Sequence, residues 1–273
     1  MKFIKYLVFA LLHFSGISAL YCLCTPWRAR ILCYHRISEF PRDPLLDVSK
    51  KKFEEQVKYL TRCYTPMHLS DIVEFFYEKK TPHRLSCALS FDDGSEDWLS
   101  LVIPVLKRYN VPATFFTTTG FIGNGLIPYP HPHAPARALT YEELTALAAS
   151  SLVTIGGHTV THPHLSRLKE PEMREEIKTS KRMLELWTGK LVNLYAYPFG
   201  NEADYNETTK RVTKEEGLKA GFSIEERTAT SSDDLYELPR MVIFDEPLWI
   251  FKVRVSGIID DFLYFFKQLI KSK

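Results

Sequence analysis

Three short segments of the chain carry the residue types that metal-dependent hydrolysis needs. They read SFDDG at 90–94, HTVTHP at 158–163 and YPFG at 197–200. Two neutral imidazoles and a carboxylate form a ligand set typical of zinc and similar divalent ions, and three protein ligands leave positions open for water and substrate. The other carboxylate of the acidic pair stays free to act as a base. The segments together predict a metal-dependent hydrolase.

The spacing assigns a different task to each acidic residue. Asp93, His158 and His162 are the predicted metal ligands, and the two histidines share a face if residues 159–161 form a helical turn. Asp92 is the predicted general base, because adjacent side chains on a strand point in different directions. Each segment alone is a weak signal, since paired acids are common in turns and histidine pairs arise by chance. Their joint occurrence after predicted strands is much stronger.

Apolar runs that read as strands alternate along the chain with helix-like patterns. The predicted strands are 31–34, 87–91, 113–118, 153–156, 194–197, 222–224 and 241–244, with helices over 99–109, 141–149 and 172–187. Strand, loop and helix repeated about seven times indicate a parallel α/β architecture, and the polar candidates follow strand ends as in TIM-like barrels. A doubly wound open sheet is the alternative. No glycine-rich phosphate loop opens a helix, so no nucleotide cofactor is expected.

Composition sets further bounds. The 273 residues are 45% apolar, which suits one domain with a sizeable core. Lys and Arg number 35 against 33 for Asp and Glu, and a net charge of +2 gives no reason to expect nucleic acid as a partner. Five cysteines without metal-like spacing do not predict a disulfide framework. Cys33 and Cys87, both in predicted strands, are expected to be small core residues.

Both ends of the chain are apolar in different ways. Residues 6–24 lack Asp, Glu, Lys and Arg and follow Lys2 and Lys5. A helix of that length spans about 28 Å, so residues 1–24 are predicted to be a signal peptide or a membrane anchor, with 25–30 as a linker. Residues 258–273 alternate apolar and polar positions as an amphipathic helix does. Packing on the barrel and contact with a membrane surface both remain open for that helix.

The three segments resemble the first three motifs of the polysaccharide deacetylase family, also called the NodB-homology or carbohydrate esterase 4 family. VPATFF at 111–116, GFIG at 120–123 and LPR at 238–240 extend the likeness. The resemblance covers residues 31–257 and implies a distorted (β/α)7 barrel. It also implies metal-dependent removal of acetyl groups from N-acetylated sugars.

The resemblance implies roles for individual residues. Asp92 is the base, and Asp93, His158 and His162 hold the metal. The backbone amide near Phe199 binds the oxyanion of the tetrahedral intermediate, a task that N–H groups perform well. Pro198 fixes the turn that aims this amide, and Tyr197 belongs to the same substrate-side segment.

The chain departs from the common family pattern in two places. Many members have an arginine where this chain has Ala196, and Arg240 is the candidate replacement. Many also have a Leu-x-His motif near the C-terminus, but no histidine follows Arg240. His35 can take the place of this missing histidine. The chain is similar to the circularly permuted poly-N-acetylglucosamine deacetylase branch, in which the histidine that acts as the acid lies near the start. We therefore predict that His35 protonates the leaving amine.

The resulting hypothesis is a deacetylase that releases acetate from an N-acetylated polysaccharide or glycoconjugate. Its ion is a divalent metal, zinc first and Co²⁺ or Ni²⁺ as alternatives. The catalytic domain is expected outside the cytoplasm, secreted or held at a membrane by the N-terminal segment. Two alternatives remain: a related deacylase acting on a non-polymer or lipid-linked amide, and a sugar-binding barrel without catalysis.

Overall fold

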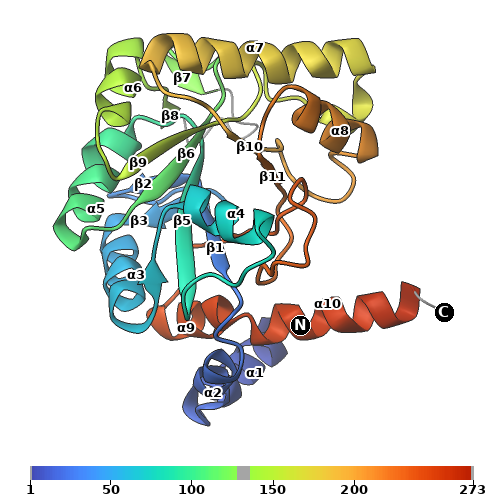
Figure 1. The fold of residues 1–273 in the computed structure, drawn as a ribbon. Coiled ribbons are helices and arrows are strands. Elements are labelled where there is room, and N and C mark those ends of the chain that lie inside the picture. The colour runs from blue at the N-terminus through green and yellow to red at the C-terminus, as the bar shows by residue number, and fades with distance from the viewer. Residues whose placement is uncertain (1, 128–135, 272–273) are drawn as a thin grey trace.

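The computed structural model describes residues 2–127 and 136–271 of the chain. Its centre is a curled parallel sheet with helices around the outside (Figure 1). In spatial order the seven strands are β11 (Ala220–Phe222), β10 (Leu194–Ala196), β9 (Val153–Gly157), β6 (Ala113–Thr117), β5 (Ser86–Asp93), β1 (Arg30–Tyr34) and β12 (Met241–Val242). From β1 around to β11, each neighbouring strand comes later in the sequence, and β12 then returns to pair with β1. This is the winding of a barrel, whereas a doubly wound sheet reverses its strand order. The predicted distorted barrel is confirmed.

The barrel wall is completed by residues that precede β12. Phe222 at the end of β11 forms an isolated parallel bridge with Leu238. Two residues further on, the Arg240 Nε donates to the carbonyl oxygen of Ser223 at 3.2 Å. The segment 238–240 therefore spans the gap between the two end strands, and it places the Arg240 guanidinium inside the barrel.

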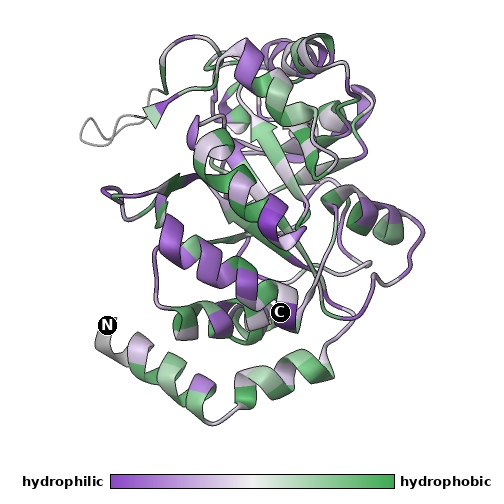
Figure 2. Cartoon of the chain, turned by 90° about the vertical axis from the view of Figure 1, so that its left-hand side faces the viewer, coloured by the Kyte–Doolittle hydropathy of each residue, from purple (hydrophilic) through white to green (hydrophobic). Residues whose placement is uncertain are grey.

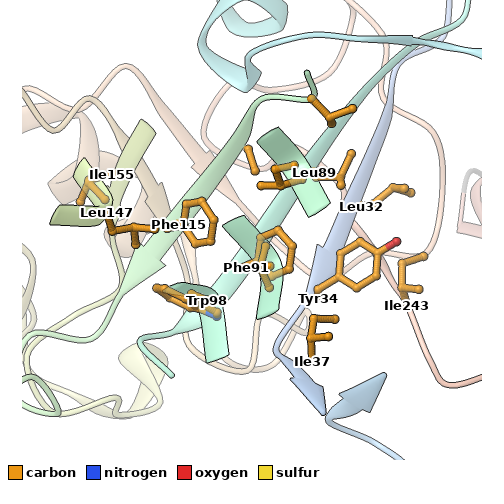
Figure 3. Close-up of a cluster of buried hydrophobic side chains, with 14 of the residues drawn as sticks. Leu32, Tyr34, Ile37, Leu89, Phe91, Trp98, Phe115, Leu147, Ile155 and Ile243 are labelled. Carbon is orange, nitrogen blue, oxygen red and sulfur yellow. The ribbon is translucent and has the colours of Figure 1, made fainter. Parts of the chain in front are cut away.

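The strands present one face to the helices and one to the barrel interior. On the outer face, Phe91 of β5 stacks between Tyr34 of β1 at 5.2 Å and Phe115 of β6 at 5.0 Å (Figure 3). These three residues are directly paired in register. Because side chains alternate along a strand, an outward Phe91 turns the following Asp92 into the barrel. The hydrophobic core thus fixes the direction of the predicted base.

The helices cover the outside of the sheet and connect its strands. They are α3 (Lys50–Cys63), α4 (Leu69–Tyr77), α5 (Ile103–Tyr109), α6 (Tyr141–Ala148), α7 (Glu170–Thr188), α8 (Glu207–Glu215) and α9 (Leu248–Ser256). The helix expected over 99–109 is instead a π-turn over Trp98–Val102 followed by α5. Pro104 has no N–H to donate to the carbonyl four residues earlier, so the regular helical ladder cannot pass through it. Thr140 and Glu143 form a capping box at α6.

Short strands pair at the ends of the barrel. β2 (Arg36–Ser38) pairs in parallel with β3 (Asp47–Ser49), directly after β1. β7 (Leu126–Ile127) pairs antiparallel with β8 (Ala136–Arg137), between β6 and α6. β4 (Thr65–Pro66) pairs with the beginning of β5. The first two pairs lie at the carboxyl end of the sheet, where they border the cavity described below.

Three terminal helices pack together at the amino end of the barrel. α1 (Lys2–Phe14), α2 (Ile17–Cys24) and α10 (Ile258–Lys271) lie against α9 (Figure 1). Within residues 2–127 and 136–271, no single helix has the length and apolar character of a membrane span. Tyr6–Phe14 and Ile17–Cys24 meet those criteria only as a pair, and that pair is bent by 68°.

Candidate active site

A cavity of about 660 Å³ opens at the carboxyl ends of the strands. Six of the predicted site residues line it: His35, Asp92, Asp93, His158, His162 and Phe199. Most of the remaining lining is apolar and comes from loops around the mouth: Leu45, Leu46, Phe121, Ile127 and Ile224. The cavity therefore combines a polar floor with an apolar rim.

One side of the floor brings together the three predicted metal ligands. The Nε2 atoms of His158 and His162 lie 3.6 Å and 3.4 Å from the Oδ1 atom of Asp93. Donor atoms of all three residues lie within 4.8 Å of one another. Ligands about 2.0–2.2 Å from a shared zinc ion are separated by roughly this much in a tetrahedral site. The donor set therefore fits a small divalent ion in both chemistry and spacing.

The orientation of His158 is set by the third motif. Its Nδ1 atom lies 2.8 Å from the carbonyl oxygen of Ala196 at the end of β10. A carbonyl only accepts hydrogen bonds, so Nδ1 carries the proton and Nε2 presents its lone pair to the cavity. Burial lowers the pKa of His158 to about 4, so the ring is neutral at pH 7 and able to bind a cation.

His162 reaches the site from a loop with left-handed backbone, so the expected helical turn over 159–161 is wrong. Thr159 has φ 66° and His162 has φ 60°, both outside the helical region. The Thr159 hydroxyl accepts the His162 N–H at 2.9 Å. Burial lowers the pKa of His162, but the hydrogen bond to Asp93 and the charges of Asp93 and Asp92 together outweigh burial and leave the pKa raised. The histidine pair therefore meets through loop geometry and not through helical spacing.

Glu176 holds this loop and was missed by the sequence analysis. From α7, its Oε2 accepts the backbone N–H groups of Val160 and Thr161 at 2.7 Å and 2.9 Å, and its Oε1 accepts the Thr161 hydroxyl at 2.7 Å. Both carboxylate oxygens are thus committed to the segment between the two histidines. No sequence signal separates Glu176 from the other surface acids of α7.

Asp93 turns toward the histidines because the strand ends at it. Its φ of 89° breaks the alternation of β5 and redirects its side chain into the cavity. Gly94 follows with φ 115°, a conformation that favours glycine. Burial raises the pKa of Asp93, but hydrogen bonding and charge interaction with His162 hold it well below the usual range. Asp93 is therefore an anion that can bind a metal.

Asp92 is paired with Arg240 inside the barrel. The two guanidinium Nη atoms donate to the two carboxylate oxygens, each at 2.7 Å, and both side chains are fully or almost fully buried. Arg240 also donates to the Ser90 hydroxyl at 3.2 Å. Burial raises the pKa of Asp92, but the charge and hydrogen bonds of Arg240 together with the nearby histidines outweigh this and keep the pKa below its ordinary value. Arg240 thus occupies the position next to the predicted base.

His35 and Cys33 lie on the other side of Asp92. Donor atoms of Cys33, His35 and Asp92 are within 4.8 Å of one another. The buried Cys33 thiol donates to the Asp92 Oδ2 at 3.5 Å, so this cysteine is more than the core residue that the sequence suggested. The backbone around His35 is held from both sides. Trp98 Nε1 donates to its carbonyl oxygen at 3.1 Å, and the Ile37 N–H donates to Asp97 at 2.7 Å.

Phe199 occupies a tight turn at the edge of the cavity. Its φ is 61°, and the Gly200 N–H donates to the Pro198 carbonyl oxygen at 2.7 Å, which closes a three-residue turn. Within the described chain, no group accepts a hydrogen bond from the Phe199 N–H. Gly200 also has positive φ, and a Cβ there would lie 2.8 Å from the Ile224 nitrogen. The turn therefore leaves a backbone donor beside the cavity.

Three predicted residues lie behind the cavity and not in its lining. Tyr197 is buried, and its hydroxyl donates to the Tyr236 carbonyl oxygen at 2.8 Å. Its ring stacks on Tyr205 at 4.7 Å. Pro198 contributes its carbonyl to the turn, and Arg240 lies beneath Asp92. Tyr197 thus packs in the core outside the sheet, whereas Arg240 lies inside the barrel.

Comparison with known proteins identifies the class. The family model for polysaccharide deacetylase matches residues 79–221, just over half of the chain. The poly-beta-1,6-N-acetyl-D-glucosamine N-deacetylase of Staphylococcus aureus is 30% identical over 210 residues, covering 73% of this chain and 68% of that protein. The chain belongs to the polysaccharide deacetylase family, and it is an enzyme of that class.

Solved structures share the same fold. The deacetylase PplD of Streptococcus pyogenes, solved in complex with acetate, matches with a TM-score of 0.70 and 25% identity, covering 81% of this chain and 95% of that one. IcaB of Ammonifex degensii also matches with a TM-score of 0.70, at 21% identity over 84% and 97% of the two chains. The family match over 79–221 contains the three motifs but neither His35 nor Arg240. The roles of His35 and Arg240 are therefore argued from the geometry of this chain and not from the family match.

Proposed function

We propose that this chain is a metal-dependent N-deacetylase acting on a polymer of N-acetylglucosamine type. The observation that carries the proposal is the arrangement of two groups in one cavity. Asp93, His158 and His162 converge on one side of the floor, and Asp92 and His35 lie close together on the other. A polymer of β-1,6-linked N-acetylglucosamine is the preferred substrate, because the Staphylococcus aureus relative is named for deacetylating that polymer.

The metal would be held by Asp93, His158 and His162, with zinc as the preferred ion. When bound there, a divalent ion supplies Lewis-acid polarisation of the acetamide carbonyl and of the attacking water. Asp92 takes a proton from that water as the new C–O bond forms. The Phe199 N–H donates to the oxygen that becomes negatively charged.

His35 completes the reaction. It transfers a proton to the amide nitrogen as the C–N bond breaks, so that the sugar leaves as a free amine and the acyl group as acetate. Asp92 and His35 thus need opposite protonation states, one carboxylate and one imidazolium, within the same cavity. The ion pair with Arg240 keeps Asp92 ionised for its part.

The proposal includes a location. We infer a catalytic domain outside the cytoplasm, secreted or associated with a membrane through the apolar residues 1–24. The polymer substrate and the apolar composition of that segment support this location.

The apolar rim favours a second candidate activity on the same machinery. Phe121, Ile127 and Ile224 surround the mouth, and an acetyl group is small against a cavity of about 660 Å³. An acyl chain or aglycone larger than acetyl would bury apolar surface there. Rates on N-acetyl and N-butyryl glucosamine oligomers separate the two candidates, because an acetyl-specific enzyme prefers the shorter group.

The deciding experiment measures acetate release from β-1,6-linked N-acetylglucosamine oligomers by the full chain. We expect chelation to abolish turnover and added zinc to restore it. Asp92→Asn and His35→Ala should each lower kcat by about 10² to 10⁴, the usual size of a general acid or base contribution. The exposed His83→Ala serves as the matched histidine control and should retain the full rate. Oligomer binding without turnover by the zinc-loaded wild type would instead favour a sugar-binding barrel.

A further inference from the structure

The terminal helices expose large apolar side chains at the end of the barrel that lies away from the cavity. We call this surface the terminal platform. Its members are Tyr6, Leu7, Leu11, Phe14, Ile17, Leu20 and Leu23 of α1 and α2, and Phe262, Leu263 and Phe265 of α10. Figure 2 shows α1 and α2 along the lower edge of the molecule, coloured mostly as hydrophobic. Single exposed leucines are normal on proteins, but a continuous set on adjoining helices marks an interaction surface.

α2 is inverted relative to an ordinary surface helix. α2 buries Ser18 and Cys22 against the domain, whereas its larger apolar residues Ile17, Leu20 and Leu23 face outward. A helix that packs on a soluble core normally places its largest apolar residues inward. The sequence of α2 is therefore suited to an apolar environment on its outer side.

α10 shows the same inversion. Asp261 is buried, and its carboxylate accepts hydrogen bonds from the Thr228 N–H at 2.9 Å and from the Tyr21 hydroxyl at 2.8 Å. The adjoining Phe262 and Leu263 are about 60% exposed. The polar Asp261 thus points toward the protein while Phe262 and Leu263 point away from it, although Ile258 and Ile259 at the start of α10 pack against the domain.

Specific contacts hold the platform in its bent shape. On α1, Phe9 packs with Ile250 and Val253 of α9. On α2, the Cys22 thiol lies 3.2 Å from the Tyr64 hydroxyl within the main core. The described side chains of α1 and α2 are therefore packed as part of the domain.

We propose that the terminal platform docks on an anionic phospholipid bilayer, with α1, α2 and α10 lying in the interface. Charge complementarity selects this partner. Residues 1–24, the segment of α1 and α2, contain Lys2 and Lys5 but no Asp or Glu, and the twelve residues after Asp261 contain three lysines and no acid. Apolar residues combined with basic residues are the features that bind helices to anionic membrane surfaces. This inference deepens the membrane association within the proposed function, but it is tested separately from turnover.

Docking would direct the cavity away from the lipid. The platform packs at the amino end of β1, next to residues 25–30, and His35 lies at the carboxyl end of the same strand. The bound enzyme would thus present its cavity to a polymer in the surrounding medium and not to a sugar attached to the same bilayer.

Vesicle flotation of the full chain tests the proposal. We expect it to float with phosphatidylglycerol–phosphatidylethanolamine vesicles, and far less with phosphatidylcholine vesicles. L20S/L263S should weaken binding by about tenfold or more, since each leucine loses its apolar contact with lipid. The control L186S/L191S changes two even more exposed leucines, at the end of α7 and in the loop after it, and should bind as the wild type does.

Several outcomes would overturn the proposal. These are a wild type that stays with the soluble fraction, equal loss in the control variant, or protein that resists alkaline carbonate extraction as a membrane-spanning chain does. A dimer that L20S/L263S dissociates would make a second copy the occupant. Acetate release from soluble oligomers should be equal in all variants, with or without vesicles. Absent turnover in the wild type would count against the deacetylase proposal and leave the flotation result intact.

Discussion

Arg240→Met is the most informative single change, because it removes the guanidinium that holds the buried Asp92 carboxylate by two 2.7 Å hydrogen bonds. Removing one partner of a buried ion pair costs about 3–5 kcal/mol of unfolding free energy, since the other charge is left without compensation. Asp92 then relieves this cost by binding a proton, because burial alone raises its pKa. A protonated Asp92 cannot accept a proton from water.

The effect on activity follows from the protonation state. At pH 7 we expect acetate release to fall by about 10² to 10⁴, the contribution of a general base, and to recover in part as the pH rises. The effect on stability has the opposite pH trend. In the wild type the lowered pKa of Asp92 stabilises the fold above pH ~4, and this contribution is lost as the pH falls through the folded pKa. In the variant, burial raises the pKa of Asp92 and so costs stability at pH 7. This cost is lost as the pH falls toward 4, so the stability gap between wild type and variant should narrow from pH 7 to pH 4.

The assays are acetate release across pH 5–9 and urea unfolding at pH 4 and pH 7. Arg254→Met is the matched control, because Arg254 is also buried and ion-paired but lies outside the cavity. It should lose stability without shifting the pH profile. The double variant R240M/D92N should be more stable than R240M alone, because it leaves no unpaired charge. An R240M enzyme with wild-type kcat and an unshifted acidic limb would refute the reasoning.

Three further predictions concern neighbouring residues. Burial raises the pKa of Asp97 to about 7, so this acid stabilises the fold below pH ~4 and loses that contribution as the pH rises to 7. Asp97→Asn should therefore raise the unfolding free energy at pH 8 by roughly 1–4 kcal/mol, measured in urea, and an unchanged value would contradict the pKa. Glu176→Gln should weaken zinc binding by about 10–100-fold in a chelator competition, because it loosens the histidine loop; equal affinity would remove its positioning role. Gly200→Ala should lower the unfolding free energy by more than about 1 kcal/mol, because Gly200 has a positive φ and the new methyl group would lie 2.8 Å from the Ile224 nitrogen. Thermal unfolding measures this loss, and an unchanged stability would show that the turn relaxes.

Much of the barrel was predictable because its signals are local. Each buried strand is an apolar run, and each was predicted to within a few residues, as at 113–118 for the observed Ala113–Thr117. The capping box at Thr140 was likewise readable from four consecutive residues. The break before α5 was not predicted, although Pro104 was visible, because the apolar spacing on both sides of it continues as in one helix.

The contacts that set the charge and geometry of the site were harder to predict from the sequence, because they join distant parts of the chain. Asp92 and Arg240 are 148 residues apart, and they meet only because the segment 238–240 spans the gap beside β12. The sequence suggested Arg240 only through a missing arginine at Ala196. Glu176 offered no signal at all, since its partners are backbone N–H groups that carry no sequence information.

The backbone conformations that the sequence did not indicate are those with positive φ at the site. Asp93, His162 and Phe199 all have positive φ, and they come from three separate loops around one cavity. Such conformations cost of order 1–3 kcal/mol each and persist only where the surrounding structure enforces them. Here the enforcing contacts are the strand pairing before Asp93, the Glu176 carboxylate beneath the histidine loop and the turn closed by Gly200. Local propensity argues against each of these conformations, so the conformations could not be predicted from propensity, although the motifs had indicated the three residues as site candidates. The same rigidity places the donor atoms within a few ångströms of one another, which is what binding an ion and orienting an amide both require.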